Sequence, residues 1–97
     1  MTPVRAEPIL NARFTNHALA EMARRGLEPS SARAVLERPE QRWTLRAGRD
    51  ILQTRIAAGE PPTTYLIRVV VDVDRSPAEV VTAYRTSKMR KYWRTAP

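Results

Sequence analysis

The first third of the chain places apolar residues at helical spacing. Leu19, Met22 and Ala23 fall on one side of a segment whose other positions are mostly polar. Residues suited to capping stand at both ends of this segment: Thr15, Asn16 and Gly26. We therefore expect a first helix over about residues 16–25.

A second helical pattern follows almost at once. Its apolar stripe consists of Ala32, Val35 and Leu36. Ser30 or Ser31 can serve as its N-terminal cap, and Pro39 must end it because proline cannot continue a helix.

After Pro39 the apolar positions alternate, which is typical of strands. Short segments rich in glycine or proline separate the runs. We expect strands over residues 42–46, 50–56, 63–73 and 79–86. Residues 87–93 fit either a short helix or an extended tail.

These elements predict an α+β fold. Two N-terminal helices pack on one face of a roughly four-stranded antiparallel sheet, since short turns do not allow parallel crossovers. A short C-terminal helix or tail follows, and the other sheet face stays open. Residues 1–13, with two prolines, are expected to be extended, and residues 14–97 to form one domain.

Charge is distributed unevenly over the sequence. The net charge is +7, but residues 1–79 are close to neutral. Residues 80–97 contain no acid and five bases: Arg85, Lys88, Arg90, Lys91 and Arg94. This pattern favours an anionic partner, most commonly nucleic acid. A GC-rich genome or a tail that aids solubility would give the same pattern.

Composition excludes several kinds of site. With no cysteine and one histidine, disulfides, cysteine zinc sites and multi-histidine metal centres are ruled out. Asp72 and Asp74 fit a strand-end role better than a magnesium site. We expect no cofactor, no resident metal and no membrane association, and a cytoplasmic location.

His17 is the first candidate for chemistry, because its unperturbed pKa lies near neutrality. Glu21 and Arg24 follow it at intervals that place all three on one polar helix face. The alternative is a solvated helix face or a capping histidine.

The strands carry further candidates. Val80, Thr82, Tyr84 and Thr86 alternate onto one side of the last strand. Arg55 and Arg68 lie within the two preceding strands, where they can grip a phosphate. Ordinary β-propensity and snorkelling at a sheet edge are the alternatives.

Tyr92 and Trp93 lie among basic residues. They can stack on unpaired bases, or they can fold back and close the core. Both interpretations remain open.

Several of these residues together resemble the DUF4258 family over about residues 14–86. The matching stretches are Thr15-Asn16-His17-Ala18, Met22, Arg25-Gly26-Leu27, Val35-Leu36, Pro39 and Thr82-Ala83-Tyr84. The family is similar to BrnT and RelE-like toxins of the barnase/EndoU/colicin/RelE fold. Glu21 departs from it, since the family often has arginine there.

The resemblance implies a metal-independent ribonuclease toxin in which the ribose 2′-hydroxyl attacks the adjacent phosphate. His17 would be base or acid, Tyr84 would transfer the other proton or bind the phosphate, and Thr82 would position Tyr84. Arg55 would hold the phosphate, with Arg25 or Arg68 as second candidates. Further RNA contacts would come from Arg24, Arg85, Lys88, Arg90 and Lys91.

The resemblance also implies partners. These are RNA, on or off the ribosome, and an acidic antitoxin protein that covers the basic face. Two other functions stay open: a non-catalytic RNA- or protein-binding module of the same fold, and a DNA-binding protein. The sequence gives the DNA-binding alternative poor support, because no helix carries basic residues along one face.

Overall fold

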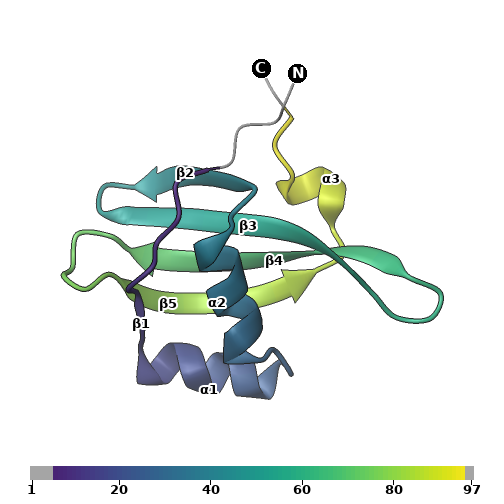
Figure 1. Ribbon diagram of the computed structural model, residues 1–97, viewed down its shortest axis with the longest axis horizontal. Coiled ribbons are helices and arrows are strands. Elements are labelled where there is room, and N and C mark those ends of the chain that lie inside the picture. The colour runs from purple at the N-terminus through teal and green to yellow at the C-terminus, as the bar shows by residue number, and fades with distance from the viewer. Residues whose placement is uncertain (1–5, 96–97) are drawn as a thin grey trace.

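The computed structural model of the chain describes residues 6–95. Its centre is a mixed sheet of five strands in the order β1-β5-β4-β3-β2 (Figure 1). The strands are β1 (Arg13–Phe14), β2 (Gln41–Arg46), β3 (Arg49–Ala58), β4 (Thr63–Asp72) and β5 (Glu79–Thr86). The helices are α1 (Asn16–Arg24), α2 (Pro29–Glu37) and α3 (Met89–Tyr92). The α+β class is thus confirmed.

Local capping chemistry explains where the two longer helices begin. The Thr15 hydroxyl accepts a hydrogen bond from the Ala18 backbone N–H at 3.0 Å, as the sequence predicts. In α2, however, the cap position is Glu28 and its side chain makes no capping bond. The predicted cap at Ser30 or Ser31 is wrong, because Pro29 takes the first helical position, where its fixed φ suits a helix and its missing N–H costs nothing.

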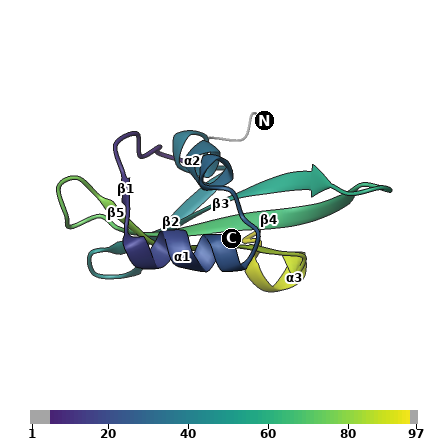
Figure 2. The same ribbon diagram turned by 90° about the horizontal axis from the view of Figure 1, so that it is seen from below.

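The helices lie on different sides of the sheet. Figure 2 shows α2 above one face, α3 below the other, and α1 alongside the β5 edge. The expectation that both N-terminal helices cover one face is therefore only roughly met. Along residues 6–95, no helix combines the length and apolar character needed to span a bilayer.

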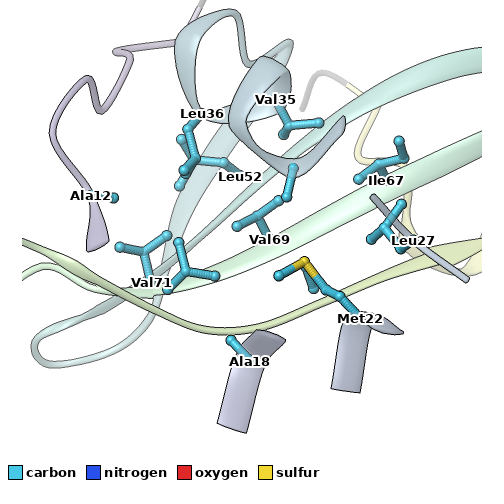
Figure 3. Close-up of a cluster of buried hydrophobic side chains, with 13 residues drawn as sticks. Ala12, Ala18, Met22, Leu27, Val35, Leu36, Leu52, Ile67, Val69 and Val71 are labelled. Atoms are coloured by element: carbon cyan, nitrogen blue, oxygen red, sulfur yellow. The ribbon is translucent and has the colours of Figure 1, made fainter. Parts of the chain in front are cut away.

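The core lies between α2, the sheet face beneath it and the inner side of α1 at the β5 edge (Figure 3). From α1 it takes Ala18 and Met22, both 0% exposed. Leu19, expected in the buried stripe, is 39% exposed, and Ala23 is exposed as well. The helix sits at a sheet edge, so only a narrow strip of its surface is covered.

The fifth strand was not predicted. β1 pairs in parallel with β5, with Arg13 opposite Glu79 and Phe14 opposite Val80. The segment before it also belongs to the packed unit, since Ala12 is 4% exposed. The predicted four-stranded antiparallel sheet is corrected to four antiparallel strands plus this short parallel one. Residues 1–5 of the predicted extended segment lie outside the described residues.

A bulge changes which side chains share a face of β5. Val70 pairs with Thr82 but Val71 pairs with Val80, so Val81 is the extra residue. Val80 is thereby turned into the core, 0% exposed, away from Thr82 and Tyr84. Strict alternation would have placed all three on one side.

One ion pair fixes the end of the β3–β4 hairpin. Arg49 donates two hydrogen bonds to Asp72, at 2.7 and 3.2 Å. The hydrogen bond from Arg49 lowers the pKa of Asp72 below its ordinary 3.8, in spite of partial desolvation. The carboxylate form is therefore the stabilising one.

Asp72→Asn is expected to lower the free energy of unfolding by about 1 kcal/mol at neutral pH. Because the pKa of Asp72 is lower in the folded state, its contribution is complete above the unfolded value and is lost as the pH falls through the folded value. Urea denaturation of both proteins at pH 7 and pH 3 measures this. A difference between them that is equal at both pH values would contradict it.

Candidate anion-binding face

The sheet face turned away from α2 is called the open face here. Residues paired across neighbouring strands point to the same side, so the register assigns its members. Gln41 and Trp43 of β2 pair with Gln53 and Ile51 of β3, Gln53 pairs with Arg68 of β4, and Arg68 pairs with Tyr84 of β5. A row of polar and aromatic side chains therefore crosses four strands.

Arg68 is the centre of this row and is only 6% exposed. Its Nε donates to Gln53 Oε1 at 2.9 Å, and its Nη1 donates to the hydroxyl of Tyr84. Gln53 is fully buried and is held in turn by Gln41 Oε1 at 2.6 Å and the Tyr92 carbonyl at 3.1 Å. The guanidinium is thus fixed entirely by neutral groups.

Tyr92 of α3 folds back onto this network. Its ring lies 3.9 Å from the Arg68 guanidinium carbon and meets the Tyr84 ring edge-on, with centroids 6.3 Å apart. Partial desolvation would raise the pKa of the Tyr92 phenol, but the Lys91 ammonium, the Tyr84 hydroxyl and the Arg68 charge outweigh it and lower the pKa. Of the two interpretations of Tyr92 and Trp93, the structure shows folding back.

Beside the Tyr84 ring lies a hollow of about 400 Å³, lined by Arg25, Tyr84 and Arg85. The Arg25 guanidinium carbon is 5.8 Å from the ring centroid. Arg25 also contacts Glu21, at 3.0 Å between Nη2 and Oε1. Arg25, at the end of α1, therefore approaches the Tyr84 ring from one edge of β5, whereas Arg68 approaches it from β4 at the other edge.

The helix candidates are only partly brought together. Glu21 pairs with Arg24 and Arg25. His17 is exposed at the other end of α1, about 12 Å along the axis from Arg25. Over the described part of the chain its imidazole makes no hydrogen bond or ion pair. Glu21 therefore holds the two arginines rather than the imidazole, and the catalytic role of His17 stays a prediction.

The remaining strand candidates differ in their surroundings. Arg55 is exposed, is bound by both Glu40 oxygens at 3.1 and 2.8 Å, and stacks 4.2 Å from the Trp93 ring. The hydrogen bond to Glu40 raises its pKa. Thr82 is half-buried, two residues before Tyr84 on the same face of β5. Arg55, expected to hold the phosphate, thus already has a carboxylate partner, whereas Arg68 and Arg85 have none within residues 6–95.

The basic residues near α3 are exposed. Lys91 lies 5.2 Å from the Tyr92 ring, and Lys88 and Arg90 project from the same turn. No ion pair involves these three within the described chain. They flank the open face with uncompensated charge.

Sequence reasoning missed three members of the face. Gln53 and Trp43 were not singled out from the sequence, and Arg94 counted only as part of the basic C-terminal segment. The register joins them, with the Arg94 guanidinium carbon 4.0 Å from the Trp43 ring centroid. Arg68, a charge within the apolar run of the β4 segment, was the available signal for this face.

Comparison with known proteins places the chain in a family. Searches of curated proteins and of solved structures gave no significant match. The sequence profile described as a domain of unknown function, DUF4258, matches residues 14–85. This range runs from β1 to the Arg85 of the hollow and includes Arg25, Arg68 and Tyr84. The strand residues of the open face lie within the matched range, whereas Tyr92 and Arg94 lie beyond it, and the chain belongs to the DUF4258 family.

Proposed function

We propose that this protein binds RNA on the open face and cleaves it, without a metal ion, at the hollow beside Tyr84. The observation that carries the proposal is the buried guanidinium of Arg68. It is 6% exposed, and its partners are an amide, a phenol and an aromatic ring. A buried cation without a carboxylate is costly, and an anion bound nearby offsets that cost.

The surrounding charge supports a phosphodiester as that anion. Arg25 and Arg85 line the hollow, and neither Arg85 nor Lys91 has an ion-pair partner in residues 6–95. Guanidinium groups bind phosphate oxygens in a bidentate manner. The Arg85 guanidinium carbon lies 4.8 Å from the centroid of the Tyr65 ring, which does not line the hollow.

The chemistry follows from these groups. The ribose 2′-oxygen loses its proton to a base, attacks phosphorus and displaces the 5′-oxygen, which takes a proton from an acid. The products are a 2′,3′-cyclic phosphate and a 5′-hydroxyl. Arg25 and Arg85, which line the hollow, stabilise the charge that builds up on the phosphate oxygens, and Arg68 holds the Tyr84 hydroxyl in place. In this proposal Tyr84 at the hollow and Tyr92 beside it, whose pKa is lowered, transfer the protons, because His17 lies at the far end of α1.

A RelE- or BrnT-like toxin role is part of this proposal. An acidic antitoxin would cover the uncompensated charges of the open face, and such an RNase would act in the cytoplasm. The similarity rests on the residues quoted above and on the α+β arrangement of helices and sheet.

Incubation of the purified chain with end-labelled single-stranded RNA in EDTA tests the proposal. We expect fragments ending in 2′,3′-cyclic phosphate. His17→Ala is expected to leave the rate within about threefold of wild type, because the imidazole lies at the far end of α1 from the hollow, and a larger loss would move the reaction to the start of that helix. Asn16→Ala, a change at the neighbouring exposed position, is the matched control. Absence of cleavage by the wild-type chain would refute the proposed nuclease activity.

The second candidate is a non-catalytic RNA-binding module. Two observations favour it: Glu21 compensates part of the charge of Arg25, and His17 lies at the far end of α1 from the hollow. This candidate predicts RNA binding with salt dependence but no cleavage, so the same assay separates the two.

A further inference from the structure

We infer that the open face carries a second subsite, formed by Trp43 and Arg94, that stacks an unpaired base of a single-stranded RNA. The inference rests on the proposed function for the identity of its ligand. It adds to it a substrate class, single-stranded RNA, and a binding position away from the cleaved bond. Neither residue lines the hollow at Tyr84.

Cations and rings alternate across the open face. The Arg94 guanidinium carbon is 4.0 Å from the Trp43 ring, the Arg68 guanidinium carbon is 5.9 Å from that ring, and Arg68 lies 3.9 Å from the Tyr92 ring. We call these four residues the cation–aromatic stack. It begins next to Tyr84 and ends at the free edge of the sheet, on β2.

The outer end of the stack is exposed but fixed in position. The Arg94 side chain is exposed, whereas its backbone N–H donates to Gln41 Oε1 at 3.1 Å and its carbonyl accepts from Gln41 Nε2. The same Gln41 oxygen accepts from the buried Gln53. The backbone that carries the exposed Arg94 guanidinium is thus held beside the half-buried Trp43 ring, which lowers the entropy cost of binding.

Nothing within residues 6–95 neutralises Arg94, whose guanidinium has the Trp43 ring as its partner. Guanidinium planes and indole rings are the surfaces on which RNA-binding proteins stack splayed bases. A base on the outer side of Arg94 would continue the alternation, and its phosphate would meet positive charge. The bases of a duplex are stacked on one another and are not available for this contact.

Spacing separates this subsite from the hollow. Trp43 on β2 and Tyr84 on β5 are three strand intervals apart, about 14 Å. The stacked base therefore belongs to a nucleotide beyond the two that flank the cleaved bond. A long substrate gains from the contact, and a dinucleotide does not.

Binding measurements that do not depend on cleavage test the subsite. The probe is a fluorescent 2′-O-methyl oligoadenylate of about 12 nucleotides, which has no attacking hydroxyl. Trp43→Ala is expected to weaken its binding about tenfold, and Trp43→Phe by less than about threefold, because the ring is kept. Arg94→Gln is expected to weaken it at least about threefold, against less than twofold for Arg38→Gln, an equal loss of charge at the exposed end of α2.

Inorganic polyphosphate, a polyanion without bases, separates stacking from charge. Trp43→Ala is expected to bind it as the wild type does. Equal losses for polyphosphate and oligoadenylate, equal affinity for duplex and single strand, or no effect of either Trp43→Ala or Arg94→Gln would overturn the inference. Arg94→Gln decides the matter should Trp43→Ala fail to fold.

The inference and the proposed function fail separately. If RNA cleavage depends on Tyr84 but Trp43→Ala binds RNA normally, the proposed nuclease activity stands and the stacking subsite is refuted. If binding depends on Trp43 but no RNA is cleaved in EDTA, the stacking subsite stands and the proposed nuclease activity is refuted. A dinucleotide substrate should be cleaved at equal rates by wild type and Arg94→Gln.

Discussion

Arg68→Ala is expected to abolish detectable RNA cleavage and to lower the free energy of unfolding by about 3 kcal/mol. The side chain is nearly buried, donates to Gln53 and Tyr84, and supports the ring of Tyr92. Removing it leaves acceptors without donors and a cavity under α3, and each of these costs on the order of 1–3 kcal/mol. Urea denaturation measures the stability, and the EDTA assay measures the rate.

Arg68→Met separates the structural from the functional effect. The methionine fills much of the cavity, so roughly half of the stability loss should be recovered while cleavage stays abolished. Arg33→Ala is the matched control, because Arg33 also stacks on a ring, 4.7 Å from Phe14, and donates to the Ala12 carbonyl, but lies with α2. Wild-type cleavage by Arg68→Met would show that the guanidinium only supports the fold.

Local signals in the sequence were sufficient for most of the elements. Thr15 and Pro39 bound their helices because capping and the missing proline N–H act on nearest neighbours. β1 could not be predicted in this way. Arg13 and Phe14 are too few to show a period, and they form a strand only because β5 offers backbone partners 66 residues later.

The candidate site depended on register, which the sequence does not encode locally. Arg68 was noted as a charge inside an apolar strand, and Tyr84 as a hydroxyl on a sheet face. Their contact requires both the β4–β5 pairing and the bulge at Val81, and the loop between those strands carries no signal for either. Trp43 reached the same face through two further pairings.

Ion pairs also depended on the fold. Arg55 and Arg68 are both strand arginines, but the fold places Glu40 beside one and only neutral groups beside the other. Charge counting cannot make that distinction. Positive charge that remains uncompensated in the folded chain is what directs the functional proposal to the open face.

Tyr84→Phe is expected to reduce the rate of RNA cleavage about a thousandfold and to change the stability by about 1 kcal/mol. The hydroxyl is the group that Arg68 holds at the hollow, and losing a positioned proton donor costs about 10²–10⁴ in rate. The fold loses only one hydrogen-bond acceptor, since the ring still meets Tyr92 and Arg25. Single-turnover cleavage in EDTA, with unfolding curves for both proteins, measures the two effects.

Tyr65→Phe is the matched control. The Tyr65 ring also packs against an arginine, but it lies on the sheet face that α2 covers and does not line the hollow. We expect its rate to stay within about twofold of wild type. A separate measurement of binding to uncleavable 2′-O-methyl RNA should show little change for Tyr84→Phe, since the phosphate is held by the arginines. If Tyr84→Phe cleaves RNA at the wild-type rate, the Tyr84 phenol transfers no proton, and the reaction depends on Tyr92 or takes place where His17 lies, at the opposite end of α1.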